Sequence, residues 1–272
     1  MSNNILRLKK AVHSFLHQLS TDPLKRPYDG DRYHCPVCDT YLKYFIPISS
    51  DYLADLDKYQ CVHSLFLSET FNFNLYSCPR CMADDRSRLY ALYFKDFIAK
   101  CDLKDKFKII DFAPCGAFSD FLKKSEVLQY RSADLYMPNV DDKVDISDMH
   151  IYSDNSFDIF LCSHVLEHVD DDTKAMKELF RILKPGGWGI AMVPINLGLT
   201  ESLEDKNIIS PADRWKYYGQ NDHVRFYAKH DFVKKLSAAG FQVNQFDVQH
   251  FGEEVFIKNG INLRSVLYIV QK

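Results

Sequence analysis

Residues 157–194, FDIFLCSHVLEHVDDDTKAMKELFRILKPGGWGIAMVP, decide the fold of this chain. The apolar run FDIFLCS is followed by a segment in which apolar residues recur at helical spacing between Ala175 and Leu183. The Pro-Gly-Gly of residues 185–187 stops that helix, and a second apolar run, WGIAMVP, follows. Two buried strands joined by an amphipathic helix are the unit from which parallel sheets are built.

The same alternation continues on both sides of this unit. Five further strands are predicted, at 107–113, 130–136, 143–146, 243–249 and 264–271, and a helix at 230–240. We therefore predict an α/β fold with a mainly parallel seven-stranded sheet and helices on both faces. Residues 195–228 show little periodicity, which is typical of a long binding loop or lid.

Composition narrows the class of protein. In 272 residues, 46% are hydrophobic and 26% are charged, which excludes a disordered or fibrous chain. The net charge of -3 provides no positive field for nucleic acid, so we do not expect a nucleic-acid partner. No apolar stretch approaches the roughly 18 residues of a membrane span, and the N-terminus lacks a signal core. We expect a cytoplasmic protein, and nothing in the sequence indicates its oligomeric state.

The pattern predicts three parts. Residues 1–34 hold an amphipathic helix at 4–19, with a solvated or a membrane-surface face, and a Pro-rich linker. Residues 35–104 hold a cysteine module and a connecting helix capped by Asp84 or Asp85. Residues 105–272 form the α/β domain, with the lid at 195–228.

Two C-P-x-C pairs predict a structural zinc site in the module. Cys35 and Cys38 form one pair, and Cys78 and Cys81 form the other, so that four thiolates can surround one Zn²⁺ ion. The alternatives are reduced cysteines without metal, or a redox pair. The 39 residues between the pairs form an insertion that contains Cys61 and His63, to which we assign no role.

The strand ends carry the residues expected at a nucleotide site. About twenty residues after the first strand, Asp134 ends the second, where nucleotide folds place a carboxylate on ribose hydroxyls.

Four motifs together resemble a known family. CPRCMADDRSRL at 78–89, CSHVLEHV at 162–169, LKPGG at 183–187 and GQNDHVRFY at 219–227 are similar to those of Rossmann-like S-adenosylmethionine-dependent methyltransferases with a type 11 domain. The resemblance is to bacterial members that carry an N-terminal cysteine module, and it covers residues 35–272. It implies the cofactor S-adenosylmethionine, bound by Asp111, Ala113, Pro114, Gly116, Asp134, Leu135, Asp145, Ile146, Cys162 and Ser163.

One departure from the family pattern concerns the loop after the first strand. The family has alternating glycines there, whereas this chain has Ala113, Cys115 and Ala117. Glycine serves unusual backbone angles, so we expect the loop to take another path around Pro114.

Two histidines are candidates for a general base. His164 follows Ser163 at a strand end, and His223 lies in the lid beside Arg225. We favour His223 from the sequence, because a closing lid would exclude water. Related O-methyltransferases imply a further possibility, a Mg²⁺ or Mn²⁺ ion at Glu167 and His168.

The leading hypothesis is O-methylation of a sugar, a glycan precursor or another polar small molecule. The residues expected to bind this acceptor are Arg86, Arg214, Gln220, Arg225 and Tyr227. The alternatives are an RNA or protein acceptor gripped by the zinc module, and a degenerate, non-catalytic interaction module.

Overall fold

The structure, a computed structural model, describes residues 26–272, so the expected helix at 4–19 lies outside the described residues. A central sheet of seven strands organises this part of the chain, in the order β5-β4-β3-β6-β7-β9-β8. The first five strands are parallel neighbours, and β9 is antiparallel to both β7 and β8. The strands are β3 (Phe107–Phe112), β4 (Leu128–Asp134), β5 (Asp142–Lys143), β6 (Phe157–Ser163), β7 (Leu183–Met192), β8 (Gln242–Phe246) and β9 (Leu267–Gln271). The predicted α/β class and the seven-stranded, mainly parallel sheet are confirmed.

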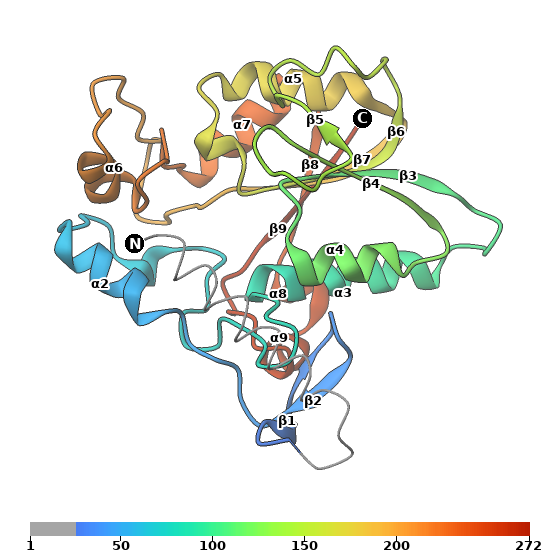
Figure 1. Cartoon of the computed structure of the whole chain (residues 1–272), viewed down its shortest axis with the longest axis horizontal. Helices are drawn as coiled ribbons and strands as arrows, with labels where there is room; N and C mark the ends of the chain where they lie inside the picture. Colours follow the sequence, from blue (N-terminus) through green and yellow to red (C-terminus); the bar gives the residue numbers. More distant parts are fainter. Residues whose placement is uncertain (1–25) are drawn as a thin grey trace.

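Helices cover both faces of the sheet, as Figure 1 shows. On one face, Phe94 and Phe97 pack against Trp188 of β7, with ring centroids 5.3 and 5.2 Å apart. On the other face, the ring of Phe241 contacts Phe160 of β6 and Phe180. The helices of the first face are α3 (Asp85–Ala99) and α4 (Gly116–Lys123), and those of the second are α5 (Asp172–Ile182) and α7 (Lys229–Ala238).

Several strand predictions ran past the observed ends, among them the one at 264–271, whose strand begins at Leu267, and two of them have a clear local cause. The strand predicted at 243–249 ends at Phe246, because Asp247 caps a helix, α8 (Val248–Phe251), with its side chain. The strand predicted at 143–146 is reduced to β5, since Asp145 starts a turn by accepting a hydrogen bond from the amide of Ser147. Helix α9 (Glu253–Lys258) also fills a stretch in which the sequence predicted no element.

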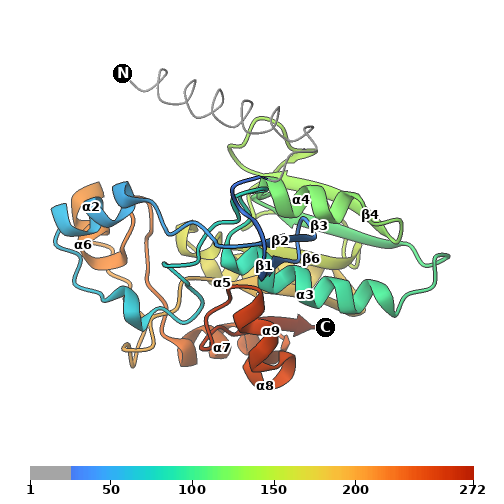
Figure 2. The ribbon, with the colours of Figure 1, turned by 90° about the horizontal axis from the view of Figure 1, so that it is seen from below.

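The insertion between the cysteine pairs and the lid, for which the sequence predicted no helix or strand, contain helices that contact each other. The insertion between the cysteine pairs forms α2 (Ser50–Lys58) and the short turn η2 (Leu65–Leu67), and the lid forms α6 (Pro211–Tyr218). Figures 1 and 2 show α2 beside α6, at one end of the sheet. Within residues 26–272, no helix is both long and apolar enough to cross a membrane.

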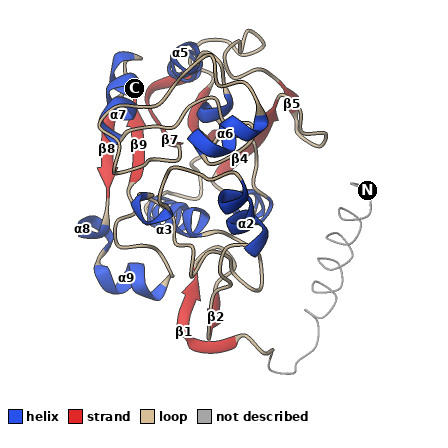
Figure 3. Ribbon diagram, turned by 90° about the vertical axis from the view of Figure 1, so that its left-hand side faces the viewer, coloured by secondary structure: helices blue, strands red, loops and turns tan. Residues whose placement is uncertain are grey.

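The cysteine module packs against the C-terminal segment. Its hairpin, β1 (Asp29–Cys35) and β2 (Thr40–Leu42), lies beside α9 in Figure 3. Arg88 of α3 fixes this contact from inside: its guanidinium is wholly buried and donates to the carbonyls of Asn259 and Gly260, and also to those of Leu75, Tyr76 and Ala83. The ring of Phe45 covers its face at 3.9 Å.

Replacing Arg88 with methionine will lower the free energy of unfolding by about 3–5 kcal/mol. Methionine fills the space, but it leaves the carbonyls of Leu75, Tyr76 and Asn259 without a donor, and each orphaned group costs roughly 1–3 kcal/mol before relaxation. The carbonyls of Ala83 and Gly260 keep a second donor, from the amide of Cys78 and the side chain of Asn72. Urea unfolding followed by circular dichroism measures the loss. The exposed Arg32→Met is the matched control and should change stability by less than about 0.5 kcal/mol. A loss below 1 kcal/mol in Arg88→Met would contradict this account.

Candidate functional site

The four paired cysteines come together at one point. The β1–β2 hairpin carries Cys35 and Cys38, and the loop before α3 carries Cys78 and Cys81, with all four sulfur atoms within 4.8 Å of one another. The Sγ atoms of Cys35 and Cys81 are 3.8 Å apart, and so are those of Cys38 and Cys78. A tetrahedral zinc ion with Zn–S bonds of about 2.3 Å requires sulfur atoms roughly 3.8 Å apart. The geometry therefore fits a closed zinc site.

The predicted cofactor residues lie along the carboxyl edge of the sheet. Phe112 of β3 pairs with Ala133 of β4 and with Cys162 of β6, so the residues that follow them are neighbours: Ala113, Asp134 and Ser163. Ligands of open α/β sheets bind outside this edge. The sequence thus predicted residues that the fold does bring together.

The loop after β3 keeps the backbone conformation for which glycine is favoured. Ala113 has a φ of 53°, in the left-handed region, and Gly116 starts α4 with open space beside it. Ala113 thus adopts the kind of backbone angle for which glycine is ordinarily used, and the expected path of the loop around Pro114 stays a prediction. An alanine adopts this angle at a cost of about 1–2 kcal/mol, which the surrounding contacts offset.

The edge residues leave suitable groups for S-adenosylmethionine. Oδ1 of Asp134 accepts the amides of Tyr136 and Met137, both at 2.6 Å, and this turn leaves Oδ2 for ribose hydroxyls. Leu135 and Asp145 are exposed beside it, whereas Ile146 and Cys162 are buried. Asp111 is buried under the loop, where it accepts hydrogen bonds from Ser119 and Tyr130 and where burial raises its pKa to about 6.

A cavity of about 410 Å³ opens next to this edge. Six polar residues that the sequence singled out line it together. They are Arg86, His164, Glu167, His168, Gln220 and His223.

His164 and Glu167 are in contact at the turn that follows β6. Nδ1 of His164 lies 3.1 Å from Oε1 of Glu167, whose side chain is wholly buried. Nε2 of His164 has no partner among the described residues. Burial and the charge of Arg86 lower the pKa of His164, so its ring is neutral at pH 7. Nε2 is buried in the wall of the cavity and keeps a free lone pair when Nδ1 carries the proton.

His223 is buried, whereas His164 is partly exposed. Its Nδ1 lies 3.2 Å from the carbonyl of Tyr218, and burial lowers its pKa to about 4. The ring stands edge-on to that of His168, at 4.7 Å between centroids. One ligand atom each from Glu167, His168 and His223 lies within 4.8 Å of the others, which also suits a divalent ion.

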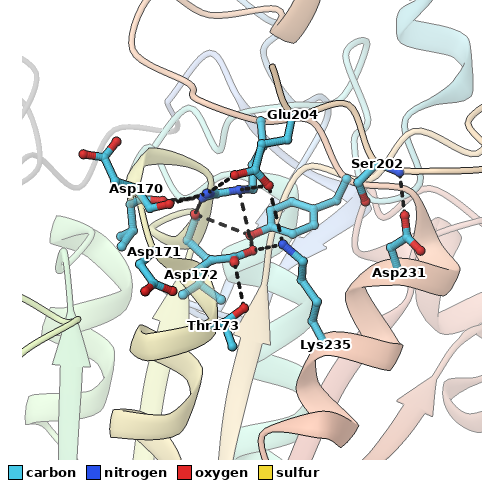
Figure 4. Close-up of polar contacts among 12 residues, drawn as sticks. Asp170, Asp171, Asp172, Thr173, Ser202, Glu204, Asp231 and Lys235 are labelled. Carbon is cyan, nitrogen blue, oxygen red and sulfur yellow. Dashed lines mark hydrogen bonds and ion pairs between the residues drawn. The ribbon is translucent and has the colours of Figure 1, made fainter. Parts of the chain in front are cut away.

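Three predicted acceptor-binding residues do not reach this cavity. Arg225 is 1% exposed and donates to the carbonyls of Leu166, Val169 and Asp170 and to Glu204, while the hydroxyl of Tyr227 donates to Asp172. Figure 4 shows Glu204, Asp172 and Lys235 around this cluster. Contrary to the expectation, Arg225 and Tyr227 are structural: they hold η3 (Leu166–His168), the turn that carries Glu167. Arg214 lines a second, smaller hollow.

Sequence reasoning missed several residues around the site. Tyr90 of α3 bonds Ser163, with 2.8 Å between the hydroxyl oxygens, and Asp84 binds Arg86 at 2.7 Å. Half of the residues that line the cavity come from the insertion at 39–77, between Ile48 and Tyr76. Its aromatic content was visible in the sequence, but its place over the sheet edge was not.

Comparisons with known proteins show the family of the chain. Residues 82–245 match the family model described as a methyltransferase domain. Among solved structures, the CurJ carbon methyltransferase is 12% identical with a TM-score of 0.44, over 68% of this chain and 53% of that one. This chain therefore spans about half the length of that protein.

Two archaeal structures are similar at the same level. A methyltransferase from Archaeoglobus fulgidus is 14% identical (TM-score 0.43, over 68% of this chain and 94% of that one). A chain of the complex between the Haloferax volcanii Trm112 activator and a methyltransferase is 16% identical (TM-score 0.40, over 69% and 94%). No curated protein matches the chain.

Proposed function

Because the chain belongs to the family of methyltransferase domains and is an S-adenosylmethionine-dependent methyltransferase, we propose that it methylates a hydroxyl group of a polar small molecule. A sugar or glycan precursor is the acceptor that the sequence favours. The cysteine pairs, which bind zinc only when reduced, support the cytoplasm as its compartment.

The cofactor supplies an already activated methyl group, so the chain has to hold it, align the acceptor and remove a proton. Asp134 would bind the ribose, and the loop from Ala113 to Gly116 would pass the methionine part. Ser163, fixed by Tyr90, would lie under the cofactor at the end of β6.

The observation that carries the proposal is the pair of His164 and Glu167 between the cofactor edge and the cavity. His164 takes the proton from the acceptor hydroxyl at Nε2, while the carboxylate of Glu167 orients the ring and stabilises the imidazolium that forms. We place the base at His164 rather than at His223, because Nδ1 of His164 meets the carboxylate of Glu167 whereas Nδ1 of His223 meets the carbonyl of Tyr218, and because the low pKa of His223 makes it a weak base.

A second proposal concerns the expected ion at Glu167 and His168. With His223, the cluster offers two imidazole nitrogens and one carboxylate, a set that suits Mn²⁺ better than Mg²⁺. Such an ion would lower the pKa of the acceptor hydroxyl. Loss of activity in a mild chelator, restored by Mn²⁺, supports it; full activity after chelation excludes it.

Asp134→Ala will weaken S-adenosylmethionine binding by roughly 1.5–3 kcal/mol, because charge-assisted hydrogen bonds to ribose are lost. Isothermal titration calorimetry measures the change. Asp134→Asn is the matched variant: its amide oxygen can still accept the amides of Tyr136 and Met137, so it separates the turn from the charge. Wild-type affinity in both variants would show that Asp134 is not a ligand and would remove the main cofactor contact proposed here.

A further inference from the structure

The insertion between the cysteine pairs and the lid form a single cap. The amide of Val62 donates to the carbonyl of Lys216, and Nε2 of His63 lies 2.8 Å from the carbonyl oxygen of Tyr217. The ring of Tyr59 stacks on Trp215 at 5.8 Å, nearly parallel. Two segments more than 150 residues apart in the sequence therefore hold each other over the carboxyl edge of the sheet (Figure 2).

The same contacts position residues 219–223, the polar part of the lid that lines the cavity. Tyr217 and Tyr218 directly precede the stretch that carries Gln220 and His223 into the cavity, and Nδ1 of His223 meets the carbonyl of Tyr218. The hydroxyl of Tyr52 approaches the carbonyl of Gly219 at 3.5 Å. The insertion thus supports residues 219–223, the part of the lid that lines the cavity together with His164.

The cavity has two chemically different walls. The sheet side carries the charged groups together with two imidazoles, namely Arg86, His164, Glu167 and His168. The insertion provides all the aromatic side chains of the row together with aliphatic ones, which are Ile48, Tyr52, Leu56, Leu65, Phe71 and Tyr76, and it also adds the smaller polar set of Cys61, His63, Ser64, Ser68 and Thr70. A bound molecule would meet charged groups on one side and aromatic and aliphatic surface, with some polar groups, on the other.

Three rings of the insertion form a row in that wall. The centroid of Phe71 lies 6.5 Å from that of Tyr52 and 5.5 Å from that of Tyr76. Among residues 26–272, the hydroxyl of Tyr76 has no hydrogen-bond partner, and the row therefore ends in a free donor beside Arg86.

We infer that the cap is the acceptor-recognition element and that the row of Tyr52, Phe71 and Tyr76 binds the apolar face of a hydroxylated ring. The ring's reacting hydroxyl would then point to Nε2 of His164, and a second polar substituent would meet the hydroxyl of Tyr76. Such a face is presented by a sugar ring, through its C–H groups, and by a phenol. This inference rests on the proposed function, because it deepens the acceptor site of the same reaction.

The test measures binding of two neutral ring probes, methyl β-glucopyranoside and 4-hydroxybenzyl alcohol, to protein saturated with S-adenosylhomocysteine. Saturation-transfer NMR gives each dissociation constant. We expect at least one probe to bind in the millimolar range, and the one that binds identifies the source of the ring. Phe71→Ala should weaken that probe about 3- to 10-fold, in line with the loss of one aromatic contact. Tyr76→Phe keeps the ring and should weaken it less.

The matched control is Phe66→Ala, a residue of the same insertion that is 66% exposed and does not line the cavity. It should leave probe binding unchanged. The inference is overturned if neither probe binds the wild-type protein, if Phe71→Ala binds like wild type, or if Phe66→Ala is as weak as Phe71→Ala. Calorimetry with S-adenosylhomocysteine on the same samples keeps the two proposals apart: absence of that binding in the wild type counts against the proposed function, whereas intact binding without a ring probe counts only against the cap.

Discussion

Cys78→Ser will leave most of the protein unfolded or insoluble, and the wild-type protein will contain about one tightly bound zinc per chain. Structural zinc contributes directly to folding, with apparent binding free energies of about 10–16 kcal/mol in small zinc domains. That exceeds or equals the whole stability of an ordinary domain, about 5–15 kcal/mol. The sulfur of Cys78 is 3.8 Å from that of Cys38 and is wholly buried, so a serine hydroxyl there cannot restore the fourth ligand.

The loss will extend beyond the hairpin, because the second cysteine pair is tied to α3. The amide of Cys78 donates to the carbonyl of Ala83, and Asp84 then caps α3 and binds Arg86 at the cavity. Elemental analysis and circular dichroism measure both effects. Cys101→Ser, outside the cluster, is the matched control and should keep zinc and fold. Freshly reduced wild-type protein without zinc, or a stable Cys78→Ser, would refute the zinc assignment.

The centre of the sheet was predictable because β3, β6, β7 and β9 are largely buried and read as apolar runs. Strand ends were less predictable: Asp247 stops β8 through a single side-chain cap, and nothing in the apolar pattern of 243–249 indicates that stop. The insertion at 39–77 was unpredictable for another reason. Its partners, such as the carbonyls of Lys216 and Tyr217, are remote in sequence and leave no local periodicity.

The residues of the candidate site also divide into those that the sequence could predict and those that it could not. Asp134 was predicted because nucleotide folds place a carboxylate at the end of the second strand, whereas Ala113 and Ser163 were predicted from the family resemblance. The three are neighbours because parallel strands end at one edge of the sheet. Arg225 and Tyr227 were misjudged because residue type does not reveal burial: an arginine that saturates backbone carbonyls looks, in sequence, like one that binds a substrate anion. Arg86 differs from Arg225 only in its surroundings. Its Nε has no partner among the described residues, and its side chain faces the cavity.

His164→Asn will lower the turnover number by about 10²–10⁴ while S-adenosylmethionine affinity stays unchanged, as expected when a general base is lost. Asparagine is the informative substitution because His164 has a φ of 56°, in the left-handed region, which asparagine tolerates better than most residues. The variant therefore removes the base without adding backbone strain. His150→Asn, at an exposed histidine, is the control and should keep wild-type turnover.

The pH dependence gives an independent readout of the same assignment. A base works only when unprotonated, so the rate falls as pH decreases through its pKa in the complex. Burial and Arg86 hold the pKa of His164 below 6.5; turnover should therefore stay level from pH 8 down to about 6.5 and fall at lower pH. Glu167→Gln removes the carboxylate that favours the imidazolium, and this will shift the acid limb to still lower pH and reduce the rate. A large loss in His223→Ala, with His164→Asn near wild type and an acid limb near pH 4, would instead place the base at His223, whose pKa burial lowers to about 4.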